Sequence, residues 1–288
     1  MHSILVARAI KNFADDTNLF YSHKDLAELV LIVNWELSKL SEWFKANTLS
    51  LNAVKFNFIL FGHKRMPQNC ADVNLFLDGN RLERVTSTKF LGVFLDEKLK
   101  WTQHLNHVAI KLARGLGIMG RVSKILPLDI LRMLYFSLIY PYLVYCCIVW
   151  GSASATALHK LEVLQNRAVR MITRSPFRAT ASPIFKQSNL LKLCDIRHMQ
   201  ILLFMYKCKH ALLPESCMNY CILNLQHSYN MRNIHYFAAQ PFRTSIREHC
   251  ISVQGPRVWD LLPVSLQSSD SIESLKLNTS RYLISSLY

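Results

Sequence analysis

The chain has 288 residues, about half of them hydrophobic, and its 34 lysines and arginines against 19 aspartates and glutamates give a formal charge of +15. This length and composition support one or two folded domains with a sizeable core and exclude a disordered chain. The charge favours a polyanionic partner, most often a nucleic acid. A basic protein without such a partner is the alternative. The surplus of positive charge lies beyond Lys98, whereas the first fifty residues are close to balanced.

Two adjacent carboxylates, Asp15 and Asp16, follow Phe13 and Ala14 at the end of a short and mostly apolar run. Adjacent carboxylates repel each other, and a tight turn between two strands with a divalent cation is the usual way to hold them together. Hard carboxylate oxygens suit Mg²⁺. The alternative is a helix start in which one aspartate is the N-cap. On the dipeptide alone we favour the cap, because a two-residue motif has little specificity.

The segments on either side of this pair show clear periodicity. Before it, residues 4–7 could form a strand, but polar residues at 8, 11 and 12 interrupt the approach to Phe13. After it, apolar residues at helical spacing predict an amphipathic helix over 25–46 with one buried face, which includes Trp43. Lys55 and a strand over 58–61 follow the turn at 49–52.

Two further strand signals come next. Asp78-Gly79 between two apolar runs is a strong hairpin turn signal. The run 89–95 predicts a single strand, in which Gly92 marks a bulge or a close approach of another backbone.

From Trp101 onward the apolar spacing predicts helices, including 127–138, 158–173 and 184–213. Basic residues recur along these helices at about one-turn spacing: Lys111, Arg114, Arg121, Lys124, Arg167, Arg170 and Arg174. Helices with this pattern can line a phosphate backbone, which supplies most sequence-independent affinity for nucleic acid. Solvated basic faces without a ligand are the alternative.

The stretch 133–158 carries no charged residue and is long enough to span a bilayer. Pro141, several tyrosines and a polar second half favour a buried helix pair instead, and no positive-inside bias marks an orientation. The eight cysteines form no regular framework, so we expect reduced thiols in an intracellular protein that is not secreted. A zinc site from Cys208, His210, Cys217 and Cys221 fits no standard spacing.

Several separate blocks agree with one known family. In chain order they are Phe13-Ala14-Asp15-Asp16-Thr17, Trp43-Phe44-Lys45-Ala46-Asn47, Lys89 to Asp96, Tyr140-Pro141-Tyr142-Leu143, Leu164-Gln165-Asn166-Arg167-Ala168 and Gly255 to Pro263. In that order and spacing they resemble the C-terminal half of a reverse transcriptase from a LINE-type (non-LTR) retrotransposon of the jockey-like group. The resemblance implies an α+β fold. A partial polymerase palm with a primer-grip-like hairpin would cover 1–98, a mostly helical thumb 99–213, and a helical or irregular tail 214–288.

The same resemblance implies roles for individual residues. Asp15 and Asp16 would be catalytic and hold Mg²⁺ or Mn²⁺, and Lys55 would lie near the incoming nucleotide. Leu91 and Gly92 would belong to the primer grip, although a packing role for the glycine is an equal alternative. The basic thumb residues would contact the duplex of RNA template and DNA primer. Phe56 stands where the family usually has threonine.

Polymerisation uses two metal ions, normally held by three carboxylates. In the family the third carboxylate comes from an upstream strand, for which this sequence has no counterpart. We therefore expect a reverse transcriptase remnant that is inactive by itself and retains at most nucleic-acid binding. The alternative is a basic helical interaction protein in which the aspartate pair has no catalytic role.

Overall fold

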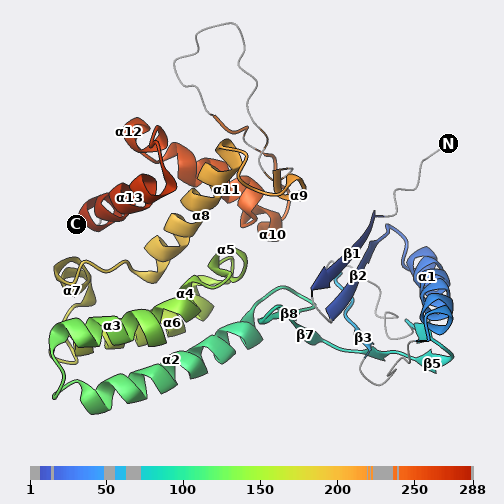
Figure 1. Ribbon diagram of the computed structural model, residues 1–288, viewed down its shortest axis with the longest axis horizontal. Helices are drawn as coiled ribbons and strands as arrows, with labels where there is room; N and C mark the ends of the chain where they lie inside the picture. The colour runs from blue at the N-terminus through green and yellow to red at the C-terminus, as the bar shows by residue number, and fades with distance from the viewer. Residues whose placement is uncertain are drawn as a thin grey trace, which may run out of the picture. The chain divides into compact units, whose positions relative to one another are not determined.

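The computed structural model describes residues 7–13, 16–48, 56–62, 73–218, 220, 222, 236–238 and 240–286. The chain divides into two compact units, Met1–Leu99 and Lys100–Tyr288. Short strands and one long helix make up the described part of the first unit, whereas the second is helical (Figure 1). This mixture of helices and small sheets is compatible with the predicted α+β class.

The first unit begins with an antiparallel hairpin of strands β1 (Ala7–Phe13) and β2 (Asp16–Ser22), in which Phe13 pairs with Asp16. The predicted interruption of the first strand is wrong, because β1 runs through Arg8 and Lys11 without a break. A ladder of backbone hydrogen bonds depends on the main chain, so polar side chains do not end it.

Helix α1 (Leu26–Ala46) confirms the amphipathic helix predicted over 25–46. Asp25 caps it, since the side-chain Oδ1 accepts a hydrogen bond from the backbone N–H of Glu28 at 2.9 Å. The buried face of α1 packs on a small apolar cluster formed by Leu37, Val73, Leu75, Leu77 and Leu82. Trp43 was predicted to be buried, but 55% of it is exposed. It lies at the edge of the apolar stripe, where no described element covers it.

The side chain of Asn34 joins α1 to the next hairpin. Its Nδ2 donates to the carbonyl of Asn74 at 3.1 Å, and its Oδ1 accepts from the N–H of Phe76 at 2.9 Å. The hairpin consists of β4 (Phe76–Leu77) and β5 (Asn80–Arg81). Asp78 and Gly79 form its turn with φ of 51° and 75°, which confirms the predicted hairpin.

The remaining strands of the first unit form two more ladders. Strands β3 (Asn57–Phe58) and β6 (Glu83–Arg84) pair in parallel. Strands β7 (Ser87–Phe90) and β8 (Val93–Asp96) form an antiparallel hairpin. The single strand predicted over 89–95 is therefore wrong, because the chain reverses direction in the middle of that run.

The second unit contains short and long helices in sequence. Their bounds are α2 (Thr102–Val122), α3 (Leu128–Leu138), α4 (Tyr140–Val144), α5 (Cys147–Trp150), α6 (Ala155–Ile172), α7 (Ala181–Gln187), α8 (Leu193–Lys209), α9 (Glu215–Met218), α10 (Ser245–Glu248), α11 (Ile251–Asp260), α12 (Val264–Gln267) and α13 (Ile272–Ser286). The uncharged stretch 133–158 is broken into several of these helices. Within the described residues, no helix has both the length and the apolar character that crossing a membrane requires.

Helices α2, α3 and α6 share one part of the core, in which Leu112, Met119, Leu131, Leu161 and Val169 are completely buried. Their close packing depends on Gly115. A Cβ atom at this position would lie 2.9 Å from Cδ1 of Ile139 and 3.0 Å from the carbonyl oxygen of Leu138.

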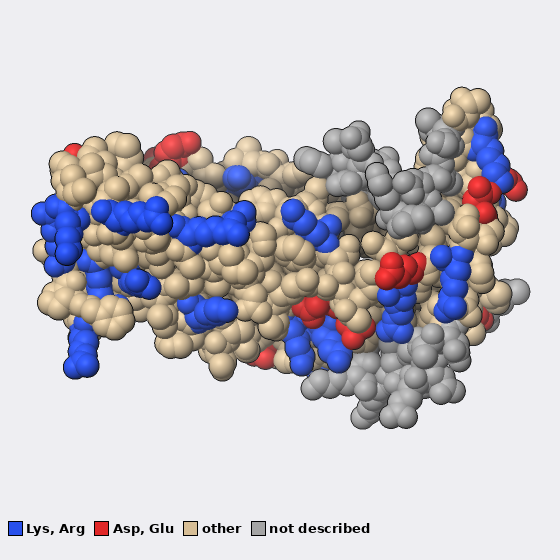
Figure 2. All heavy atoms as spheres, turned by 90° about the horizontal axis from the view of Figure 1, so that it is seen from below, with Lys and Arg blue, Asp and Glu red and all other residues tan. Residues whose placement is uncertain are grey.

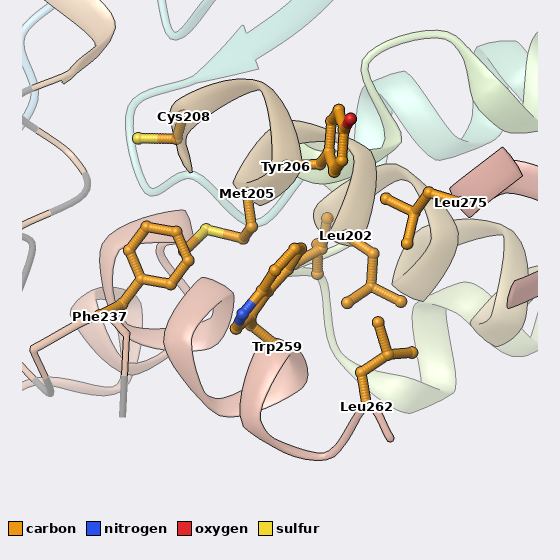
Figure 3. Packing of buried hydrophobic residues seen from close by; sticks show 9 residues of the cluster. Leu202, Met205, Tyr206, Cys208, Phe237, Trp259, Leu262 and Leu275 are labelled. Atoms are coloured by element: carbon orange, nitrogen blue, oxygen red, sulfur yellow. The ribbon is translucent and has the colours of Figure 1, made fainter. Parts of the chain in front are cut away.

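Helix α8 anchors the other part of the core, where it packs against α11 and α13. Figure 3 shows the indole of Trp259 among side chains of this cluster, whose buried members are Ile201, Leu202, Met205, Tyr206, Cys208, Phe237, Trp259, Leu262 and Leu275. Gly255 in α11 lies so close to Met205 that a Cβ atom would collide with the sulfur. The Gly255-to-Pro263 segment thus packs against α8, and Nη1 of Arg257 within it lies 3.8 Å from Oε1 of Glu248.

Candidate nucleic-acid interface

The expected catalytic residues are only partly within the described structure. Asp15 and Lys55 lie outside the described residues. Cys221, one of the four residues considered as zinc ligands, also lies outside them. Asp16 begins β2, and its backbone pairs with Phe13 at the end of the hairpin. The metal-binding and nucleotide-proximal roles of these residues remain predictions. The described cysteines form no disulfide: Cys146, Cys147, Cys194, Cys208, Cys217 and Cys250.

The expected primer-grip residues Leu91 and Gly92 form the two-residue turn between β7 and β8. Their φ angles are 45° and 83°, both in the left-handed region. Gly92 adopts this conformation without strain, whereas leucine at positive φ is uncommon. A hairpin turn explains this glycine, and the predicted bulge within a strand does not. Contact with a primer stays a prediction.

Four of the expected nucleic-acid-binding residues lie on α2 or just beyond its end. Arg114, Arg121 and Lys124 are exposed, and Lys111 is half-buried. The opposite face of α2 is buried and includes Leu105, Leu112, Leu116 and Met119. Since residues seven apart share one side of a helix, Arg114 and Arg121 lie on the exposed side of α2. Lys111 lies closer to the core, and Lys124 follows the end of the helix.

The other three expected residues lie on α6 or directly after it. Arg167 is exposed. Arg170 is half-buried, and its Nε donates to the carbonyl of Ala179 at 2.9 Å. Arg174 donates from Nε to the carbonyl of Ser123 at 3.3 Å and from Nη2 to that of Leu126 at 2.9 Å. These two arginines therefore hold neighbouring loops as well as carrying charge.

Helices α2 and α6 lie side by side and run in the same direction. Near their starts, Nζ of Lys160 donates to Oδ1 of Asn106 at 3.0 Å. Near their ends, Arg174 reaches the carbonyls that follow α2. The fold thus brings all seven expected basic residues onto two adjacent parallel helices or just past their C-terminal ends. Figure 2 shows lysine and arginine side chains gathered over the part of the surface where α2 lies, with few acidic ones among them.

The positive character of this region follows from the sequence. Between Lys100 and Lys192 the only acidic residues are Asp129 and Glu162. Glu162 lies 3.3 Å from His159 on α6. Two carboxylates cannot neutralise the cations of this stretch, so the helix pair presents a net positive surface.

His104 fixes the start of α2. It is 3% exposed, and its ring lies 5.8 Å from that of Trp150. Trp101 also contacts this region, since its indole Nε1 donates a hydrogen bond to Oγ of Ser152 at 3.0 Å. Burial, helped by nearby His107, lowers the pKa of His104 to about 4. The imidazole is therefore neutral at physiological pH and adds no charge to the interface.

Phe177 and Arg178, which are not among the residues expected from the sequence, lie at the end of the helix pair and are exposed. The signal was Pro176 directly before an aromatic and an arginine, in a short segment between two helices. Proline in such a segment indicates a turn, and a turn presents its central side chains to solvent.

Several curated proteins are similar in sequence to more than half of the chain. A stretch of 185 residues is 27% identical to the probable RNA-directed DNA polymerase from transposon BS of Drosophila melanogaster, over 63% of this chain and 20% of that protein. A stretch of 190 residues is 26% identical to the RNA-directed DNA polymerase from mobile element jockey of the same species, over 65% and 20%. The corresponding protein of the X-element is 24% identical over 168 residues, 57% and 18%.

These similarities confirm the resemblance that the sequence blocks indicate. The chain spans about a fifth of the length of the curated relatives that it matches. No family model matches the chain. No solved structure matches it either.

Proposed function

We propose that this chain, a relative of the RNA-directed DNA polymerases of jockey-like, non-LTR mobile elements, binds the duplex of RNA template and DNA primer through its helical unit. The observation that carries the proposal is the basic surface of α2 and α6. Seven expected cations lie on two adjacent parallel helices or directly after them, in a stretch that contains only two carboxylates. A rigid pair of helices holds these charges at fixed spacing, as a regular phosphate backbone requires.

The cations have two kinds of role in this proposal. Lys111, Arg114, Arg121, Lys124 and Arg167 contact phosphates directly and carry no sequence preference. Arg170 and Arg174 also hold the loops at the end of the helix pair through their hydrogen bonds to backbone carbonyls. Their loss would therefore disturb both the charge and the shape of this surface.

We further propose that these 288 residues do not polymerise DNA by themselves. The donor chemistry of Asp15 and Asp16 fits Mg²⁺ or Mn²⁺, whose hard character suits carboxylate oxygens. A bound metal pair would activate the primer hydroxyl and stabilise the leaving pyrophosphate, but it normally requires a third carboxylate. In the same proposal Lys55 lies near the nucleotide, and the turn at Leu91 and Gly92 lies near the primer end.

Salt-dependent binding tests the proposed function. We expect affinity for an RNA–DNA duplex, measured by fluorescence anisotropy, to fall steeply as salt is added. The double variant Arg114→Gln/Arg121→Gln removes two exposed cations of α2, and we expect it to lower the slope of log affinity against log salt by about 1 per lost contact.

The matched control is Arg247→Gln/Arg281→Gln, which removes two exposed cations from α10 and α13. It should leave the slope close to that of the unchanged chain. Equal losses in both double variants would show that only total charge matters. A chain indifferent to nucleic acid would favour the alternative of a basic interaction protein.

Primer extension on an RNA template tests the proposed lack of polymerisation. We expect no extension from the unchanged chain in Mg²⁺ or Mn²⁺, and none from Asp15→Ala/Asp16→Ala. Extension that disappears only in the double variant would contradict us, since another carboxylate of this chain or of a second copy would then have to complete the site.

A further inference from the structure

A tight turn closes the end of the helix pair. Its four residues are Pro176, Phe177, Arg178 and Ala179, and the N–H of Ala179 donates to the carbonyl of Pro176 at 3.0 Å. Phe177 and Arg178 are therefore the two central residues of a β-turn, whose side chains point away from the chain reversal. The turn is also held from behind, because Nε of Arg170 donates to the carbonyl of Ala179 at 2.9 Å.

The same turn lies beside the loop that follows α2. Arg174 bridges the two segments through its hydrogen bonds to the carbonyls of Ser123 and Leu126. We call the surface formed by 123–128 and 174–179 the tip. Arg174 joins its two segments, and Arg170 ties the second segment to α6, so the tip presents its outer side chains on a backbone held by hydrogen bonds.

The outer side chains of the tip combine apolar and basic groups. Phe177 is 77% exposed, more than any other aromatic side chain of the described residues, and Ile125 is 78% exposed. Leu128 is 49% exposed. The basic side chains of Lys124 and Arg178, in the same two segments, are also exposed. Isolated exposed apolar residues are ordinary, but a rigid group of them among cations needs a reason.

We propose that Phe177 is a stacking platform for an unpaired nucleotide of the bound nucleic acid, with Arg178 and Lys124 contacting the flanking phosphates. An aromatic face between cations is the arrangement by which proteins hold single strands without sequence preference. The inference rests on the proposed function and extends it: α2 and α6 bind the duplex, and the tip binds the strand where it is no longer paired.

A nucleic acid fits the tip better than a lipid surface does. Insertion into a membrane interface requires a broad apolar face, usually along an amphipathic helix. The tip instead offers one aromatic ring on a turn and two aliphatic side chains, Ile125 and Leu128, on the adjoining segment, with a cation next to the ring in sequence and a second cation on that segment. Stacking on a base uses one ring and leaves both cations free for phosphates.

Anisotropy measurements with two labelled probes test this inference on the full chain. One probe is a blunt RNA–DNA duplex, and the other is the same duplex with a single-stranded RNA extension. We expect the unchanged chain to bind the extended probe more tightly. Phe177→Ala should weaken binding of the extended probe roughly five- to hundredfold while leaving the blunt duplex unaffected. Phe177→Trp should retain the preference.

Two more variants separate stacking from general apolar contact. Phe177→Leu keeps an apolar side chain but lacks a π face, so it should lose most of the preference. Leu261→Ala removes an apolar side chain directly after α11 that is 78% exposed, equal to Ile125, and should change nothing. Full preference in Phe177→Leu would overturn the proposal.

The outcomes distinguish this inference from the proposed function. Binding of the blunt duplex with no gain from the extension would overturn the stacking platform and leave duplex binding in place. No binding of either probe would overturn both. Binding to vesicles of anionic lipid that is lost in Phe177→Ala, without any effect on the two probes, would assign the tip to a membrane surface instead.

Discussion

His104 is a titratable side chain placed where protonation is unfavourable. It lies in the first turn of α2, almost completely buried against the indole of Trp150. Desolvation of the charged form is the main cause of its lowered pKa, which falls from 6.5 to about 4. In the unfolded chain the imidazole is solvated and takes up a proton at its ordinary pKa.

We therefore expect stability to fall as the pH is lowered from about 6.5 to about 4, because the unfolded state binds the proton first in this window. The contribution of His104 is at most about 3.5 kcal/mol, since each pKa unit between 6.5 and about 4 corresponds to roughly 1.4 kcal/mol. Urea unfolding of the unchanged chain and of His104→Gln at several pH values would measure it. The variant should lose less stability over this window, and parallel curves would contradict the assignment.

Arg174 has a structural role that its charge alone does not reveal. Its guanidinium donates to the carbonyls of Ser123 and Leu126, which follow the end of α2. We expect Arg174→Gln to lower the free energy of unfolding by about 1 kcal/mol, since charged donors form stronger hydrogen bonds than neutral ones. Arg121→Gln, at an exposed position in the last turn of α2, should change the free energy of unfolding by less than about 0.5 kcal/mol. Equal effects in urea unfolding would argue against a structural role.

At the scale of elements, two glycines of α2 give opposite expectations. A Cβ atom at Gly115 would lie 2.9 Å from Cδ1 of Ile139 and 3.0 Å from the carbonyl oxygen of Leu138, which is closer than van der Waals contact allows. No atom lies within 4 Å of a Cβ atom at Gly117. Gly115→Ala should destabilise the chain by about 1–3 kcal/mol, because the neighbouring segment must move. Gly117→Ala should stabilise it by roughly 0.5–1 kcal/mol through helix propensity. Thermal unfolding by circular dichroism would measure both, and a stabilising Gly115→Ala would refute the packing.

The sequence predicts elements best where local signals agree. Helix α1 has a capping aspartate and helical spacing, and Asp78-Gly79 is a strong turn signal, so both were confirmed. The turn at Leu91-Gly92 was missed because its first residue is leucine, which belongs by propensity in a strand. Tertiary packing around the hairpin overrides that local preference.

In the candidate interface, too, features with a local sequence signal were predicted and features that depend on tertiary contacts were not. Helical spacing placed the basic residues correctly on α2 and α6, because the apolar residues between them define the opposite face. The sequence did not show that the two helices run parallel, nor that Arg170 and Arg174 hydrogen-bond to loop carbonyls. Those facts depend on contacts between segments some fifty residues apart or on the fold of a loop, for which a single sequence has no local signal.

At the scale of the whole chain, the two units differ in the size of their cores. Short two-stranded ladders and one small cluster support the described part of the first unit. The second contains many completely buried side chains, including Leu112, Trp150 and Trp259. Isolated two-stranded hairpins are marginally stable in water. Unpaired strand edges add a tendency to associate.

We expect hydrogen exchange measured by mass spectrometry to show the first unit opening at lower free energy than the second. Amides of β1 and β2 should exchange well before those of α2 and α8, because their ladder has only two strands and such a ladder opens at low free energy. Thermal unfolding should then show more than one transition. Equal protection in both units, with a single cooperative transition, would contradict this expectation.

The parallel course of α2 and α6 has an electrostatic consequence along the proposed interface. Each helix carries a macrodipole equivalent to roughly half a negative charge at its C-terminal end, and in a parallel pair the two ends add instead of cancelling. Both ends lie at the tip, where Arg174 already donates to carbonyls after α2. Part of the positive charge there is thus neutralised within the protein. Attraction for phosphate is weaker at the tip than along the helices, and a base stacked on Phe177 would supply affinity that the charge does not.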